Sequence, residues 1–298
     1  MFFNLWALHY FCIDFFNYLK SKSKVKAFFS SALLVLFCTA PVFSQILVGP
    51  EFGANYSWTS FGDKDLKDVY NVSPVLGYHV GGHLAFLVRK RFFLHASLLY
   101  SSKGRVLKGD PKNEDFDPEF KNTTRYNYID MPISYTVDFK GKIGKSKEFK
   151  YFVGVGPNVS YWLGGKGSVY NGEMKEDNYF TPQKYKIVFN KDPATQSPDE
   201  MIVQNPNRLQ LGLNLVAGAV FEPGLRQRLM VTIRYELGHS YLAKSNGIFT
   251  QTYFQDPLQS RNQGFRISVA YLYDLKTENR KRGKSTIDRK NPGKMRKR

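Results

Sequence analysis

Residues 228–243 read RLMVTIRYELGHSYLA and alternate apolar with polar side chains along most of their length. Successive side chains of an extended strand point to opposite faces of the sheet, so this segment has one apolar and one polar face. Arg234 and Glu236 lie on the polar face. Residues 208–222 and 264–275 alternate in the same way. The three segments predict strands, and the rest of the chain must decide which solvent touches their apolar face.

The same alternation recurs upstream in five segments, which are residues 46–60, 74–88, 92–107, 125–139 and 150–169. The connections between the eight segments are alternately long and short. Short turns on one side and long loops on the other are typical of bacterial outer-membrane barrels. The sequence therefore predicts an all-β fold, an eight-stranded antiparallel up-and-down transmembrane β-barrel over residues 45–275. Its long loops are expected to be extracellular, and its location is expected to be the outer membrane.

A soluble β-sandwich or lipocalin-like barrel is the alternative. Such a fold would bury the bulky face inside, and its loops would not need to alternate in length. Aromatic residues near the expected strand ends instead suit the girdles of a membrane interface. These residues are Tyr56, Trp58, Tyr100, Tyr126, Tyr161, Trp162, Tyr241, Tyr271 and Tyr273. The mean hydropathy of −0.38 excludes a bundle of transmembrane helices and agrees with an alternating barrel.

The first 44 residues have the features of a secretory signal peptide. Residues 20–26 (KSKSKVK) are basic, residues 27–39 are apolar, and Ser44 supplies a small residue at the end. The apolar run is too short to cross a bilayer comfortably as a helix. We expect residues 1–44 to be an N-terminal extension plus a signal peptide cleaved after Ser44, with a buried core helix as the alternative. Both cysteines lie in this segment, so the mature chain is expected to have no disulfide and no thiolate metal site.

The C-terminal residues 276–298 carry eleven Lys and Arg residues against two acidic residues. A segment so charged and so poor in apolar residues is expected to be a disordered tail. The even strand count places it in the periplasm. We expect it to be solvated or to bind an anionic partner, such as lipid headgroups, peptidoglycan or an acidic protein. The net charge of +18 is concentrated at the chain ends, so nucleic acid is not an expected partner, whereas outer-membrane lipid is.

The polar faces of the expected strands collect ionisable side chains. An eight-stranded barrel is just wide enough inside to be filled by side chains, and charges buried there must be paired. We therefore expect a structural polar network in the barrel interior, formed by Glu51, His79, His83, His95, Lys103, Arg105, Asp130, Arg234, Glu236 and Arg266. The same alternation assigns Asp138, Glu222 and Asp274 to inward faces. A narrow channel, with a proton or ion path through this network, is the alternative.

The sequence indicates no catalytic, cofactor or metal site. His79 and His83 share a strand face but lie roughly 13 Å apart along it, so a zinc site would need His95 or a carboxylate beside one of them. His239 and Ser240 are adjacent and point to opposite faces, which prevents a base–nucleophile pair in regular geometry. Hydrolase and phosphate-loop motifs are lacking. A lipid-modifying hydrolase is the enzymatic alternative to the non-enzymatic barrel that we expect.

Four motifs mark the expected strands: GYHVG at residues 77–81, LYSSKG at 99–104, YIDMP at 128–132 and FVGVGP at 152–157. They resemble the recurring blocks of the PorT-like group of Bacteroidota outer-membrane β-barrel proteins. The resemblance implies a barrel of the outer membrane. It also implies a structural or interaction component, since some relatives assist protein secretion or gliding and most have no assigned activity. Residues 170–207 and the basic tail depart from the pattern of the group.

Overall fold

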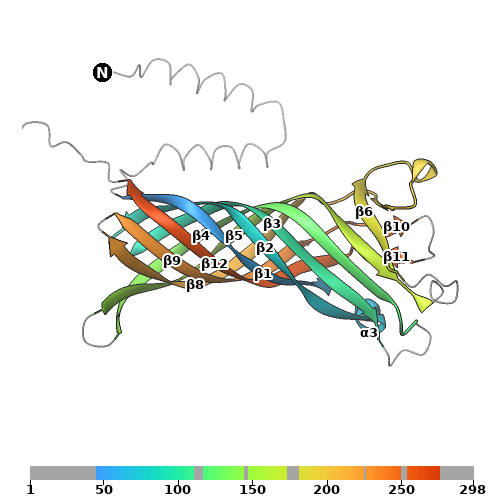
Figure 1. Cartoon of the computed structure of the whole chain (residues 1–298), viewed down its shortest axis with the longest axis horizontal. Coiled ribbons are helices and arrows are strands. Elements are labelled where there is room, and N and C mark those ends of the chain that lie inside the picture. The colour runs from blue at the N-terminus through green and yellow to red at the C-terminus, as the bar shows by residue number, and fades with distance from the viewer. Residues whose placement is uncertain are drawn as a thin grey trace, which may run out of the picture. The chain divides into compact units, whose positions relative to one another are not determined.

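The computed structural model describes residues 45–110, 117–143, 147–172, 181–224, 226–249 and 254–275. Eight long strands in these ranges pair into a closed ring (Figure 1). In ring order they are β1 (Ile46–Phe61), β2 (Tyr70–Arg89), β3 (Phe92–Gly109), β4 (Lys121–Ile143), β5 (Lys147–Tyr170), β8 (Leu209–Gly224), β9 (Gln227–Tyr241) and β12 (Ser260–Leu275). The expected signal peptide and the basic tail lie outside the described residues.

All neighbouring strands of the ring are antiparallel, and two pairings close it. β5 pairs with β8, which places Phe152 opposite Gly218, and β12 pairs with β1, which places Ala270 opposite Glu51. A closed ring satisfies the backbone hydrogen bonds within the bilayer. The predicted eight-stranded antiparallel barrel is thus confirmed. β5 has 24 residues, whereas about 9–11 suffice to cross a bilayer, so the strands project beyond the membrane.

A small sheet extends the barrel at its long-loop end. β6 (Gln183–Phe189) pairs with the end of β5, and β7 (Glu200–Val203) runs parallel to β6. β10 (Gly247–Phe249) pairs with β7, and β11 (Gln255–Asp256) pairs with β10. These four strands, called the extracellular cap below, lie at the end of the barrel opposite the start of β1 and the end of β12 (Figure 1).

The sequence predicted only polar loops where the cap lies, at residues 170–207 and 244–260. The cap strands are two to seven residues long, too short for their alternation to be told from a loop. Pairing with β5 and burial of Tyr185, Ile187 and Met201 order them. The loop after β1 likewise contains a short helix, α3 (Lys64–Val69), and a 3-10 turn, η1 (Pro193–Thr195), precedes β7. Among the described residues, no helix has the length and apolarity needed to cross a membrane.

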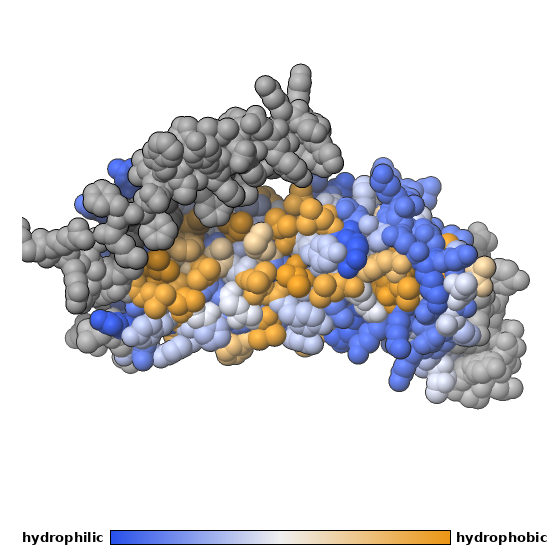
Figure 2. Space-filling model, turned by 90° about the horizontal axis from the view of Figure 1, so that it is seen from above, coloured by the Kyte–Doolittle hydropathy of each residue, from blue (hydrophilic) through white to orange (hydrophobic). Residues whose placement is uncertain are grey.

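The apolar faces of the ring strands point outward. In β9, Ile233 is 54% exposed, whereas its neighbours Thr232 and Arg234 are buried. The same holds around the ring, where Leu76 of β2 and Leu98 of β3 are more than 60% exposed. Figure 2 shows apolar residues along the barrel wall and hydrophilic residues at the end that carries the cap. A soluble barrel would bury its bulky face, so the outward apolar face excludes that alternative and is the face that meets lipid.

Two buried hydrophobic clusters occupy the two ends of the barrel. The periplasmic cluster consists of Leu47, Ala85, Phe93, Phe152, Val216, Val220, Met230, Ala270 and Leu272. The extracellular cluster joins the barrel mouth to the cap and consists of Phe61, Leu107, Phe120, Tyr126, Tyr128, Trp162, Val169, Tyr185, Ile187, Met201, Val203, Leu242, Ala243 and Leu258. The polar interior lies between them.

Two residues assigned to the aromatic girdle belong to this extracellular cluster. Tyr126 and Trp162 are fully buried, and their rings lie 5.4 Å apart in an edge-on contact. Both stand at inward positions of their strands, beside the buried Thr124 and Ser160. The girdle assignment was therefore wrong for these two residues, because strand parity decides the face and aromatic character does not.

Candidate functional site

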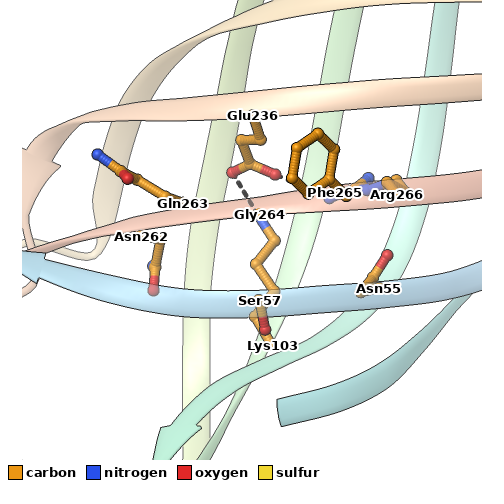
Figure 3. A pocket seen from close by; sticks show the side chains of 9 residues that line it. All are labelled: Asn55, Ser57, Lys103, Glu236, Asn262, Gln263, Gly264, Phe265 and Arg266. Atoms are coloured by element: carbon orange, nitrogen blue, oxygen red, sulfur yellow. Dashed lines mark hydrogen bonds and ion pairs between the residues drawn. The ribbon is translucent and has the colours of Figure 1, made fainter. Parts of the chain in front are cut away.

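Four charged side chains from four strands meet at the centre of the barrel. Lys103 Nζ lies 3.0 Å from Asp130 Oδ1 and 2.6 Å from Glu236 Oε1. Arg266 Nη2 lies 2.6 Å from Asp130 Oδ2 and 3.0 Å from Glu236 Oε2. Each cation thus contacts both carboxylates, in an arrangement called the central quartet below. Figure 3 shows the Lys103–Glu236 ion pair spanning the interior between their strands.

Neutral side chains complete the coordination of the quartet carboxylates. Ser160 donates to Asp130 Oδ1 over 2.6 Å, and Asn158 donates to Glu236 Oε1 over 3.0 Å. A buried ion pair is stable only when its remaining lone pairs are also hydrogen-bonded. The quartet meets that condition with groups from β5, so five of the eight ring strands are connected through one buried network.

A second polar group lies on the periplasmic side of the interior. Ser97 donates to Glu51 Oε2 over 2.6 Å, and His83 Nδ1 lies 2.9 Å from the same oxygen. His83 Nε2 is 3.0 Å from His95 Nδ1. Arg234 Nη1 lies 3.7 Å from Glu51 Oε1, beyond hydrogen-bond length, and its Nε and Nη1 find no hydrogen-bond partner among the described residues. The contact between Arg234 and Glu51 is therefore an ion pair without a hydrogen bond.

His79 forms a separate buried chain with an amide and a hydroxyl. Its Nδ1 lies 2.7 Å from Asn55 Oδ1 and its Nε2 lies 2.8 Å from Ser268 Oγ. This order of groups is that of a nucleophile, a base and an orienting residue. All three side chains are buried inside the barrel. The adjacent His239 and Ser240 do not pair: Ser240 Oγ accepts a hydrogen bond from the backbone N–H of Leu211.

Two small cavities border the polar groups, each with a volume of about 10 Å³. One lies beside Lys103, Glu236 and Gly264 of the wall, at the place drawn in Figure 3. The other lies between His83 and Arg234. A volume of this size is room for about one water molecule. Neither cavity offers space for a substrate or a hydrated ion.

The buried Arg105 connects the barrel wall to the cap. Its Nη2 donates to Asp256 Oδ1 over 2.9 Å and to the carbonyl of Pro257 over 2.8 Å. Its Nη1 donates to Ser260 over 2.8 Å. Burial raises the pKa of the Asp256 carboxyl, and the Arg105 guanidinium opposes that shift. Sequence analysis missed Asp256 because it lies in an apparent loop, although a buried arginine requires an acidic partner close by.

All ten residues expected in the interior network are at most 8% exposed. The structure brings four of them together in the quartet. It groups Glu51, His83, His95 and Arg234, and it leaves His79 and Arg105 with other partners.

Glu222 does not lie inside. It is exposed at the periplasmic rim, 2.7 Å from Lys150, because β8 continues beyond the interior. Asp274 is buried near Arg228, and Asp138 is half-buried. Within the described ranges, no group of three or more His, Cys, Asp or Glu side chains could hold a metal ion.

Comparison with known proteins gives a family and several similar structures. The family model "Outer membrane protein beta-barrel domain" matches residues 39–240. The chain is similar to Neisserial surface protein A, with 12% identity and a TM-score of 0.33 over 78% of this chain and 96% of that chain. It is similar to OprG from Pseudomonas aeruginosa, with 9% identity and a TM-score of 0.42 over 78% and 96%. It is also similar to Ail of Yersinia pestis, with 10% identity and a TM-score of 0.30 over 76% of this chain and 98% of that chain. No curated protein matches the chain.

Proposed function

Because this chain belongs to the outer membrane protein β-barrel domain family, we propose that it is a closed, non-enzymatic barrel that acts as a structural or interaction component of the outer membrane. Its working surfaces are those outside the barrel, the extracellular cap above all. Loops and loop-borne elements on a rigid scaffold are where barrels and sandwiches usually carry binding functions.

The filled interior is the observation that carries this proposal. A conducting barrel needs a continuous aqueous path, and an eight-stranded barrel has little room for one. Here the central quartet occupies the middle of the interior, and hydrophobic clusters occupy both ends. The same burial argues against a hydrolase, since Ser97 and Ser268, which contact a histidine in the described part of the chain, are inside.

An accessory role in protein secretion or gliding is the finer part of the proposal. It rests on the PorT-like motifs at residues 77–81, 99–104, 128–132 and 152–157. In the structure these motifs lie on β2 to β5, the strands next to one another that carry the quartet residues Lys103 and Asp130. The motifs are therefore parts of the barrel wall, and the partner of such a component would contact the cap or the periplasmic rim.

Planar-bilayer recordings test whether the barrel is closed. The full-length protein is expected to give no steady conductance. The variant Phe152→Ala/Met230→Ala, which thins the periplasmic cluster, is the control that reports an enlarged interior. Steady conductance of the unaltered protein that disappears on neutralising Arg234 or Glu236 would establish the narrow channel instead. Lipid hydrolysis by the purified protein, lost in Ser268→Ala, would establish the hydrolase.

The interaction role is tested in cells. Deletion of the gene is expected to reduce export of surface proteins, and normal export would contradict the secretion part of the proposal. Affinity capture from detergent-solubilised outer membrane, with and without residues 276–298, is expected to recover a defined partner. Loss of that partner with the tail would assign the contact to the periplasmic side, and its retention would assign the contact to the barrel and cap.

A further inference from the structure

An open groove of about 970 Å³ lies on the outside of the barrel wall near the cap. Its walls come from the ends of β9 and β12 and from the segment that enters β8. The positively charged or titratable side chains that line it are His239, Lys244 and Arg261, together with Tyr241 and the amides Asn205 and Asn207. Its volume is at the upper end of the range of about 300–1,000 Å³ that is typical of ligand sites.

The basic side chains that line the groove have no acidic partner among the described residues. No ion pair links Lys244, Arg261 or His239 to an Asp or Glu in the part of the chain that the structure describes, and none of the residues that line the groove is acidic. This differs from the interior, where each quartet cation contacts two carboxylates. It differs as well from the periplasmic rim, where Lys150 is paired with Glu222.

Arg261 is held in position without its charge being neutralised. Its guanidinium carbon lies 4.6 Å from the centre of the Tyr241 ring, and its Nη2 donates to the Tyr241 hydroxyl over 3.1 Å. A cation stacked on an aromatic ring keeps donors free for an anion. Arg208, at the entry to β8, is placed in the same way, with its guanidinium 4.7 Å from the Tyr161 ring and 5.1 Å from the Phe189 ring.

An apolar part of the lipid-facing wall lies further along β12 from the groove. Arg261 is on the outward side of β12, where Phe265 and Ile267 follow it and are about half exposed. Phe265 contacts Tyr235 of β9 with ring centroids 4.8 Å apart, and the separation from Arg261 to Phe265 along the strand is roughly 13 Å. An amphiphile with an anionic head in the groove would thus lay its acyl chains on an apolar surface.

We propose that this groove binds the phosphorylated headgroup of an outer-leaflet glycolipid. Lys244 and Arg261 contact phosphate oxygens, the amides of Asn205 and Asn207 donate to or accept from sugar hydroxyls, and the acyl chains follow Phe265 and Ile267. An acidic protein segment would meet the charge requirement but would leave the adjoining apolar wall unused. The site lies on the outer surface and is independent of the filled interior that underlies the proposed function.

The test is direct binding to the full-length protein in detergent, followed by native mass spectrometry. The probes are bisphosphorylated lipid A, its dephosphorylated form, phosphatidylglycerol and inorganic phosphate. We expect lipid A to bind, and Lys244→Gln/Arg261→Gln to weaken that binding roughly tenfold or more, since each basic side chain at a membrane surface contributes on the order of 1 kcal/mol. Lys140→Gln/Lys150→Gln removes the same charge at the opposite rim and is expected to leave binding unchanged.

Four outcomes would overturn the site. These are equal weakening by both double variants, no weakening by the groove variant, equal binding of dephosphorylated lipid A, and displacement of lipid A by phosphatidylglycerol or phosphate at equal concentration. If the groove double variant fails to fold, Lys244→Gln alone serves, because Lys244 is exposed and its side chain forms no bond with another described side chain. Its expected effect is a smaller loss of lipid A binding, and unchanged binding would contradict the proposal.

Discussion

Arg105 on β3 donates a hydrogen bond from Nη2 to Oδ1 of Asp256 on β11 over 2.9 Å, and both side chains are fully buried. The two residues are 151 positions apart in the chain. Asn122 of β4 donates to the same carboxylate oxygen over 3.1 Å. The cap is therefore attached to the inner wall of the barrel by a buried ion pair as well as by apolar contacts.

Removing only one member of this ion pair is expected to destabilise the protein more than replacing both members. Arg105→Met leaves the Asp256 carboxylate buried without a cation, which costs about 3–5 kcal/mol of unfolding free energy. Arg105→Met/Asp256→Leu replaces both charges by apolar groups and should restore most of that loss. Urea unfolding in detergent, followed by tryptophan fluorescence to which Trp162 of the extracellular cluster contributes, measures the unfolding free energy of both variants. An equal loss in the single and double variants would contradict the role assigned to the pair.

An exposed ion pair provides the control for this cycle. Lys150 and Glu222 lie 2.7 Å apart at the periplasmic rim, and both are substantially exposed. Such pairs contribute about 0–1 kcal/mol because water screens them. Lys150→Met is therefore expected to leave the unfolding transition almost unchanged. A large effect there would mean that detergent unfolding reports charge in general and not burial.

Arg266 and Arg234 form a matched pair for a second prediction, since both are buried arginines inside the barrel. Arg266 makes short contacts with Asp130 and Glu236, whereas Arg234 has a single contact to Glu51 at 3.7 Å and two unpartnered nitrogens. Arg266→Met should cost about 3–5 kcal/mol. Arg234→Met should cost clearly less, because it breaks one longer contact and removes two unsatisfied donors, whereas Arg266→Met breaks two short contacts and removes one such donor, Nη1.

The measurement is the urea midpoint of each variant at equal protein concentration. Arg266→Lys is a useful further variant, since it retains the charge but loses the planar guanidinium that spans two carboxylates. Its midpoint is expected to lie between those of the wild type and Arg266→Met. The reverse order for the two Arg→Met variants would show that Arg234 has interactions that the geometry does not reveal.

The barrel could be predicted from the sequence because apolar and polar side chains alternate every two residues. This alternation marks the strands and also shows which side chains face outward and which face inward. Ile233 and Arg234 illustrate this: adjacent in the chain, they face lipid and interior. The same rule would have assigned Tyr126 and Trp162 to the interior, where a preference of aromatic residues for membrane interfaces misplaced them. Alternation is therefore a stronger guide than composition wherever the two disagree.

Tertiary pairing, in contrast, could not be predicted from the sequence. Alternation placed Lys103 and Glu236 inside, but their 2.6 Å contact depends on the register between strands far apart in the chain. The sequence did not predict Asp256 as an interior residue, because β11 has only two residues and is too short to show an alternation of side chains. Its burial follows from the fold of the cap, whose strand β6 pairs with β5.

The lipid-facing wall allows a prediction that depends on depth. Ile233 lies near the middle of β9 and is 54% exposed, whereas Leu209 is the first residue of β8, at the end nearest the cap. An arginine on the lipid face costs about 2–4 kcal/mol at the bilayer midplane and about 0–1 kcal/mol near the interface. We expect Ile233→Arg to destabilise the barrel in lipid bilayers by the larger amount and Leu209→Arg by the smaller.

Reversible unfolding from lipid vesicles measures this difference directly. In a detergent micelle the charged side chain reaches water more easily, so the two variants should become more similar there. Leu209→Arg also places a positive charge close to Arg208, which adds a small repulsion that salt should screen. Equal costs for the two variants in bilayers would mean that Ile233 does not lie at midplane depth. The membrane boundary would then have to be moved along β9 toward one end.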